Sequence, residues 1–143
     1  MAREDVIKNL EELFKLEDLV NFSYLFGSRA SGHERPDSDF DIAIYPSDRF
    51  IKNYDELAKL SLLSKLELNL EKALGTEKID LIDLSNATPL LRFKVIKSGV
   101  LIFEKDKLER VSKITRWISE YLDIQPFLEY RNKIVSDSYH KDS

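Results

Sequence analysis

The chain has 143 residues, which suits a single domain and is too short for two ordinary ones. Its 22 basic and 26 acidic residues leave a net charge of −4, which argues against stable binding to duplex DNA. The absence of cysteine excludes disulfides, zinc ribbons and thiol catalysis, and two histidines are too few for a histidine-rich metal site. No apolar run approaches the ~18 residues of a membrane span, and the N-terminus is charged rather than signal-like. We therefore expect a soluble, cytoplasmic protein with no membrane contact.

Apolar spacing predicts that helices and strands are mixed along the chain. The expected elements are, in order, a helix over 3–16, strands over 22–26 and 39–45, a helix over 53–74, a strand over 79–84, a short helix over 88–98, a strand over 100–103 and a C-terminal helical region over 106–135. Pro126 is expected to interrupt or kink the last helix, and the polar residues 136–143 to form a loose tail. We predict one α/β (α+β) domain over 1–143, with a small mixed sheet of about four strands flanked by helices.

Two aspartates stand two positions apart in the strand expected over 39–45. Apolar residues alternate with them, so Asp39 and Asp41 project from one face of the strand, with Cα atoms roughly 6.5–7 Å apart. Two like charges on one sheet face repel each other. A hard divalent cation with oxygen ligands, such as Mg²⁺, resolves that conflict.

A glycine and a serine follow the strand expected over 22–26. Gly27 allows a sharp turn because it has no Cβ, and Ser28 offers a hydroxyl. Backbone N–H groups in such a turn can also hold a phosphate. The Gly-Ser pair and the aspartate pair together therefore predict a site for a metal-bound phosphate compound.

The order Gly27-Ser28, ten residues, then Asp39-Phe40-Asp41 resembles the nucleotidyltransferase superfamily of DNA polymerase β, whose signature is Gly-Ser, a spacer and Asp-x-Asp. The form seen here is similar to the minimal nucleotidyltransferases, small prokaryotic MntA-type antitoxins that are often paired with a HEPN-domain toxin. The resemblance covers roughly residues 20–105, and the C-terminal third carries no matching motif. It implies a nucleotidyltransferase-like fold.

A third carboxylate is expected from the strand over 79–84, where Asp80 and Asp83 are the candidates. By alternation these two side chains face opposite sides of the strand. Asp80 lies inside an apolar run, where an unpaired charge is costly, whereas Asp83 is nearer the strand end and suits the cap of a turn. The family pattern also favours the first aspartate, so we select Asp80.

The resemblance implies an activity and a set of site residues. AMP would pass from ATP to a hydroxyl, and the expected acceptor is a tyrosine of a cognate HEPN ribonuclease toxin. The protein would then act as the antitoxin of a type VII-like toxin–antitoxin pair. Asp39, Asp41 and Asp80 would be the catalytic carboxylates and would hold two Mg²⁺ ions. Gly27 and Ser28 would bind the nucleotide. Arg29 is expected to contact the triphosphate, with a surface ion pair as its alternative.

Two other functions stay open at this point. The chain could be a non-catalytic antitoxin that neutralises its partner by binding alone, or a nucleotidyltransferase whose acceptor is a small molecule or an RNA 3′ end. The aromatic residues Trp117, Tyr121, Phe127 and Tyr130 fit either the core or a surface that docks on a partner. The second case would allow a hetero-oligomer.

Overall fold

Helices and strands follow one another in nearly the order that the sequence predicts. The computed structural model describes the backbone of residues 2–141 and the side chains up to residue 137. The elements are α1 (Arg3–Lys15), β1 (Val20–Phe26), α2 (Ser28–Ser31), β2 (Phe40–Pro46), α3 (Asp48–Asn53), α4 (Glu56–Leu74), β3 (Ile79–Asp83), the 3₁₀ turn η1 (Leu84–Asn86), α5 (Pro89–Ser98), β4 (Val100–Glu104) and α6 (Lys107–Lys141).

The four strands form one mixed sheet in the order β3-β2-β1-β4. β1 is antiparallel to both of its neighbours, β2 and β4, whereas β2 and β3 are parallel. The central strands β1 and β2 carry most of the buried residues, and β3 is an edge strand. The prediction of a small mixed sheet of about four strands flanked by helices is therefore confirmed.

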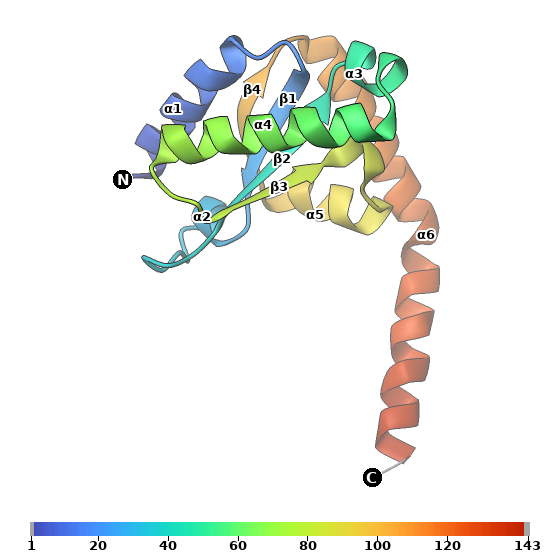
Figure 1. Cartoon of the computed structure of the whole chain (residues 1–143). Helices are drawn as coiled ribbons and strands as arrows, with labels where there is room; N and C mark the ends of the chain where they lie inside the picture. The colour runs from blue at the N-terminus through green and yellow to red at the C-terminus, as the bar shows by residue number, and fades with distance from the viewer. Residues whose placement is uncertain (1, 142–143) are drawn as a thin grey trace.

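Helices cover both faces of the sheet, as Figure 1 shows. α1 and α4 pack on one face through a core that includes Leu10, Phe14 and Leu70, and Ile42 of β2 points into it. α5 and the first part of α6 cover the other face, where a second core gathers around Trp117. The alternation predicted for β2 is confirmed, since Phe40, Ile42 and Ile44 enter the first core, whereas Ala43 and Tyr45 enter the second.

The helix predicted over 53–74 is α4, which begins a few residues later than predicted, and the short helix α3 before it was not predicted. α3 begins after Ser47, whose hydroxyl accepts a hydrogen bond from the Phe50 amide, and α4 begins after Asp55, whose carboxylate accepts one from the Ala58 amide at 2.8 Å. Each helix thus has its own N-terminal cap.

No helix in the described part of the chain is long and apolar enough to cross a membrane.

The C-terminal helix α6 is longer than the sequence predicts. Pro126 lies inside the helix without interrupting it, and residues 136–141 continue it, so the expected loose tail is wrong for those six residues. Residues 142–143 of that predicted tail lie outside the described residues. A proline removes one intrahelical hydrogen bond, but the other residues still satisfy their backbone groups within the helix.

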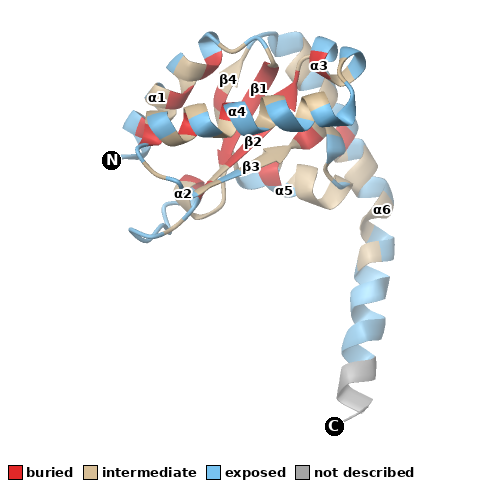
Figure 2. Cartoon of the chain, viewed as in Figure 1, coloured by how far each residue is buried: buried red, intermediate tan, exposed pale blue. Residues whose placement is uncertain are grey.

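The two halves of α6 have different surroundings. Trp117 is 3% exposed, and Tyr121 stacks on Phe93 of α5 with ring centroids 3.8 Å apart. Beyond them the helix extends away from the body of the domain, and Phe127 and Tyr130 are 75% and 67% exposed (Figure 2). The aromatic residues of the predicted helix therefore divide between core and surface.

Candidate active site

Gly27 joins β1 to the site by a turn that only glycine adopts easily. Its φ is +72° and its ψ is −155°. A Cβ built on Gly27 would lie 2.1 Å from Oδ2 of Asp41, which is the register partner of Phe26 on the neighbouring strand. The missing side chain at Gly27 therefore makes room for the Asp41 carboxylate.

A short helix starts directly after Gly27. The amides of Ala30 and Ser31 both donate to the Gly27 carbonyl at 3.2 Å, and Gly32, with φ of +81°, ends the helix α2. The sequence predicts only a polar turn here, because a single helical turn shows no apolar periodicity. Ser28 is the first residue of α2, and its hydroxyl has no hydrogen-bond partner among the described residues.

The parallel pairing of β2 and β3 brings two aspartates together from distant parts of the sequence. Asp41 is in register with Asp80, and Asp39 lies just before β2. Burial raises the pKa of the half-buried Asp41 carboxyl, and the negative charges of Asp80 and Asp39 raise it further. Asp39 and Asp80 are thus both close enough to Asp41 for their charges to act on its carboxyl.

Asp80 and Asp83 have clearly different roles in the local structure. Oδ1 of Asp83 accepts hydrogen bonds from the Ser85 amide at 2.9 Å and the Ser85 hydroxyl at 2.6 Å, so Asp83 caps η1 as expected. Its register partner is Ile44, which faces the opposite side of the sheet from Asp41. Ile79 and Leu81 led us to expect an apolar environment for Asp80. That expectation is wrong, because β3 is an edge strand and Asp80 is exposed. The register, rather than burial, favours Asp80 over Asp83.

Arg29 forms no ion pair with the described residues, so the alternative of a surface ion pair is not seen, and its contact with a triphosphate stays a prediction. Its guanidinium donates to the Ser38 carbonyl, from Nη2 at 2.9 Å and from Nε at 3.3 Å, and lies 4.2 Å above the Phe40 ring. Lys78, to which the sequence motifs assign no role, donates from Nζ to the Asp37 carbonyl at 3.2 Å. These two cations hold the loop that leads into Asp39. They are positioning residues, and no sequence signal distinguishes them from ordinary surface cations.

The family model described as "Polymerase beta, Nucleotidyltransferase" matches residues 8–108, which include every element of this site. The chain belongs to this nucleotidyltransferase family. The predicted resemblance is therefore confirmed.

Similar proteins agree with this assignment. The curated protein adenylyltransferase MntA of Shewanella oneidensis (strain MR-1) is 31% identical over 97 residues, which are 66% of this chain and 63% of that protein. The match thus spans less than two thirds of the relative. A chain in a solved toxin–antitoxin structure with AMP-PNP is 27% identical, with a TM-score of 0.64, over 97% of this chain and 99% of that one. A chain in the structure of tri-AMPylated S. oneidensis HEPN toxin in complex with MNT antitoxin is 24% identical, with a TM-score of 0.62, over 97% and 99%, and it supports the fold alone.

The donor set of this nucleotidyltransferase site suits Mg²⁺. All three side chains offer carboxylate oxygens, and a bound cation would relieve the repulsion that, after burial, raises the pKa of Asp41. Within the described residues, no group of three ligating side chains is already gathered closely enough to hold a metal ion. Binding would therefore require the carboxylates of Asp39 and Asp80 to turn toward Asp41, and both are exposed enough to do so.

The raised pKa of Asp41 predicts how the metal-free nucleotidyltransferase responds to pH. The Asp41 carboxyl binds its proton more tightly in the folded state, and this stabilises the fold. The contribution to the free energy of unfolding is complete below the ordinary pKa of 3.8 and is lost as the pH rises through the raised pKa. We expect the wild type to lose stability relative to Asp41→Asn over that window. Thermal unfolding of both proteins in EDTA across acidic pH measures this difference. Parallel pH profiles would contradict it.

Proposed function

We propose that this nucleotidyltransferase uses Mg²⁺ to transfer AMP from ATP to a tyrosine hydroxyl of a cognate HEPN-domain toxin, and so acts as an antitoxin. The observation that carries the proposal is the group of interacting carboxylates, Asp39, Asp41 and Asp80, beside the Gly27-Ser28 turn. Family membership supports the reaction class. The curated relative is named a protein adenylyltransferase, and a similar chain was solved with an ATP analogue, which supports ATP as the donor and a protein as the acceptor.

The proposed reaction exchanges one phosphorus–oxygen bond for another. The acceptor oxygen forms a bond to the α-phosphorus, the bond from that phosphorus to the bridging oxygen of pyrophosphate breaks, and the hydroxyl proton passes to a base. Mg²⁺, when bound, would neutralise charge on the triphosphate and on the leaving group. Asp80 is exposed and lies on the edge strand β3. Of the three carboxylates it is therefore best placed to receive the proton from an incoming acceptor.

The turn after β1 would hold the nucleotide. Gly27 keeps the backbone close to Asp41, and Ser28 presents its hydroxyl at the start of α2, where phosphate oxygens can accept hydrogen bonds. Arg29 acts on the same region indirectly, since its guanidinium is bound to the Ser38 carbonyl. We therefore propose Gly27 and Ser28 as phosphate-binding residues, and Arg29 as the residue that positions the loop before Asp39.

Intact-mass spectrometry of the partner protein tests this function. The product of the neighbouring gene is incubated with the protein, ATP and Mg²⁺, beside a matched reaction with the Asp39→Asn, Asp41→Asn double variant. We expect the partner to gain one or more AMP units with the wild type and none with the variant, because the variant lacks two of the three carboxylates.

Two controls separate the alternative functions. A stable complex without any mass change, formed equally by wild type and variant, would contradict the transferase proposal and leave an antitoxin that acts by binding alone. Transfer of AMP to an aminoglycoside or to an RNA 3′ end, with the partner unchanged, would keep the chemistry and contradict the proposed acceptor.

A further inference from the structure

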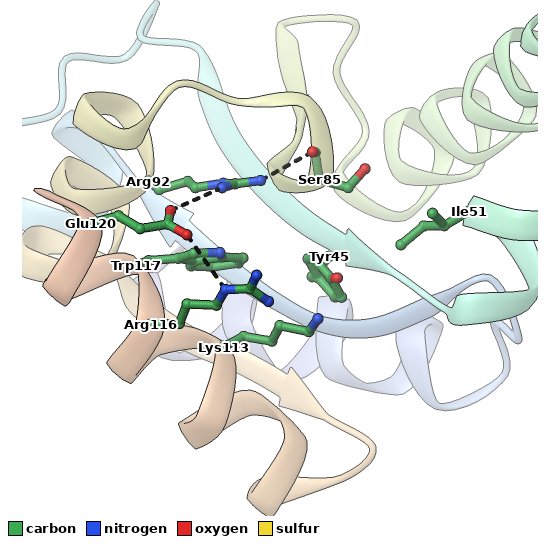
Figure 3. A pocket seen from close by; sticks show the side chains of 8 residues that line it. All are labelled: Tyr45, Ile51, Ser85, Arg92, Lys113, Arg116, Trp117 and Glu120. Carbon is green, nitrogen blue, oxygen red and sulfur yellow. Dashed lines mark hydrogen bonds and ion pairs between the residues drawn. The ribbon is translucent and has the colours of Figure 1, made fainter.

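A hollow in the protein surface lies on the same face of the sheet as Asp41 but at the other end of β2. Its volume is about 270 Å³, and the side chains that matter here are Tyr45, Arg92, Lys113, Arg116, Trp117 and Glu120 (Figure 3). Tyr45 follows Asp41 by four residues along β2, which places the hollow roughly 13 Å from that carboxylate. Ala43, between the two, is fully buried under the second core. The hollow is therefore separate from the candidate active site.

The hollow is positively charged, although the chain as a whole is acidic. Arg92, Lys113 and Arg116 face a single carboxylate, Glu120, so two positive charges are in excess. Glu120 lies between the two arginines, 3.7 Å from Nη1 of Arg92 and 3.5 Å from Nε of Arg116. Lys113 forms no ion pair with any described residue, and its ammonium lies 5.4 Å from the centre of the Tyr45 ring. An anion would complete this arrangement.

The walls of the hollow are held in place before any ligand arrives. Arg92 donates to the carbonyls of Leu84 at 2.8 Å and Ser85 at 3.0 Å, and its guanidinium lies 4.9 Å from the Trp117 ring. Trp117 and Tyr45 are 3% and 7% exposed, so their rings form a fixed floor. A ligand would therefore meet an ordered guanidinium, which reduces the entropic cost of binding.

We propose that Arg92, Lys113 and Arg116 form a binding site for a phosphate monoester, carried by a nucleoside monophosphate or present as free phosphate. The two excess positive charges match the charge of about −1.5 to −2 that a phosphate monoester carries at neutral pH. A carboxylate would leave one of them unmatched. Arginine also presents paired donors that suit phosphate oxygens, and the volume approaches the range of small-molecule sites. This site does not depend on the proposed transferase function.

The fluorescence of Trp117 tests the proposal directly, because it is the only tryptophan of the chain and lines the hollow. The full chain is titrated with AMP, inorganic phosphate and adenosine. We expect a saturable change with AMP and phosphate and none with adenosine. Equal affinity for AMP and phosphate would assign the site to the phosphate group alone, and tighter binding of AMP would assign it to a nucleotide. The Trp117 indole signal in a ¹⁵N NMR spectrum provides a second readout at the same place.

Matched variants locate the ligand. Lys113→Gln and Arg116→Gln should each weaken binding by about tenfold, since each removes one charge-assisted contact without touching the residue that anchors η1. Arg131→Gln, which makes the same charge change on the exposed half of α6, should leave the affinity unchanged. Asp41→Asn should also bind normally, even if AMP transfer fails. The proposal is overturned if neither ligand changes either Trp117 signal, or if Asp41→Asn abolishes binding while Lys113→Gln does not.

Discussion

Replacement of Asp80 by alanine is expected to lower AMP transfer by about a hundredfold or more, because the proposed Mg²⁺ site would lose one of its three carboxylates and a bound metal ion contributes several kcal/mol of charge stabilisation. The fold should tolerate this change. Asp80 is exposed on an edge strand, and its removal also relieves the repulsion felt by Asp41. We therefore expect the free energy of unfolding to stay within about 0.5 kcal/mol of wild type or to rise. Intact-mass rates of partner modification and urea denaturation measure the two effects.

Asp83→Ala is the matched control for that experiment, since both residues lie on β3. The Asp83 carboxylate caps η1 through the amide and hydroxyl of Ser85, so its loss should destabilise the protein by about 1 kcal/mol. AMP transfer at a temperature where the variant is folded should remain close to wild type. The reverse pattern, with transfer lost in Asp83→Ala and kept in Asp80→Ala, would show that the third carboxylate has been assigned to the wrong aspartate.

Replacement of Gly27 by alanine is expected to damage both stability and activity. The backbone there has φ of +72° and ψ of −155°, a conformation essentially limited to glycine that costs an L-residue about 1–3 kcal/mol. In addition, the new Cβ would lie 2.1 Å from Oδ2 of Asp41, so the carboxylate must move away from the turn. We expect AMP transfer to fall by about a hundredfold or more, because a displaced ligand cannot complete the metal site. The same mass assay and a thermal unfolding curve provide the measurement.

Gly75→Ala separates the effect of backbone strain from that of the contact with Asp41. Gly75 also has a positive φ, of +66°, but its ψ of +28° places it in the left-handed helical region, and nothing lies within 4 Å of the position that its Cβ would occupy. This variant should lose about 1–2 kcal/mol of stability to its left-handed backbone and keep its transfer activity. If Gly27→Ala were as active as Gly75→Ala, the close approach between Gly27 and Asp41 would have no role in the reaction.

Local patterns in the sequence were sufficient for the central part of the fold. The alternation along β2 correctly assigned Ile42 to one core and Asp41 to the other face, because neighbouring residues of a strand must point to opposite sides. Gly27-Ser28 and the aspartate pair were sufficient to identify the family. These features depend only on residues close together in the chain, so the sequence alone is sufficient to predict the strand alternation and the family.

Other features depend on contacts between distant residues and were visible only in the structure. The pairing of Asp80, rather than Asp83, with Asp41 follows from the register of β3 on β2, and the contact of Arg29 with the Ser38 carbonyl follows from the path of the loop that carries Ser38. The basic hollow is assembled from β2, α5 and α6, and no periodicity in any one of these elements indicates it. Composition, periodicity and short motifs thus determined the fold class, the family and the paired aspartates. Tertiary structure alone decided that Asp80 lies beside Asp41, that Arg29 and Lys78 hold the loop before Asp39, and that three cations gather near Trp117, because strand register and helix packing are set by non-local contacts.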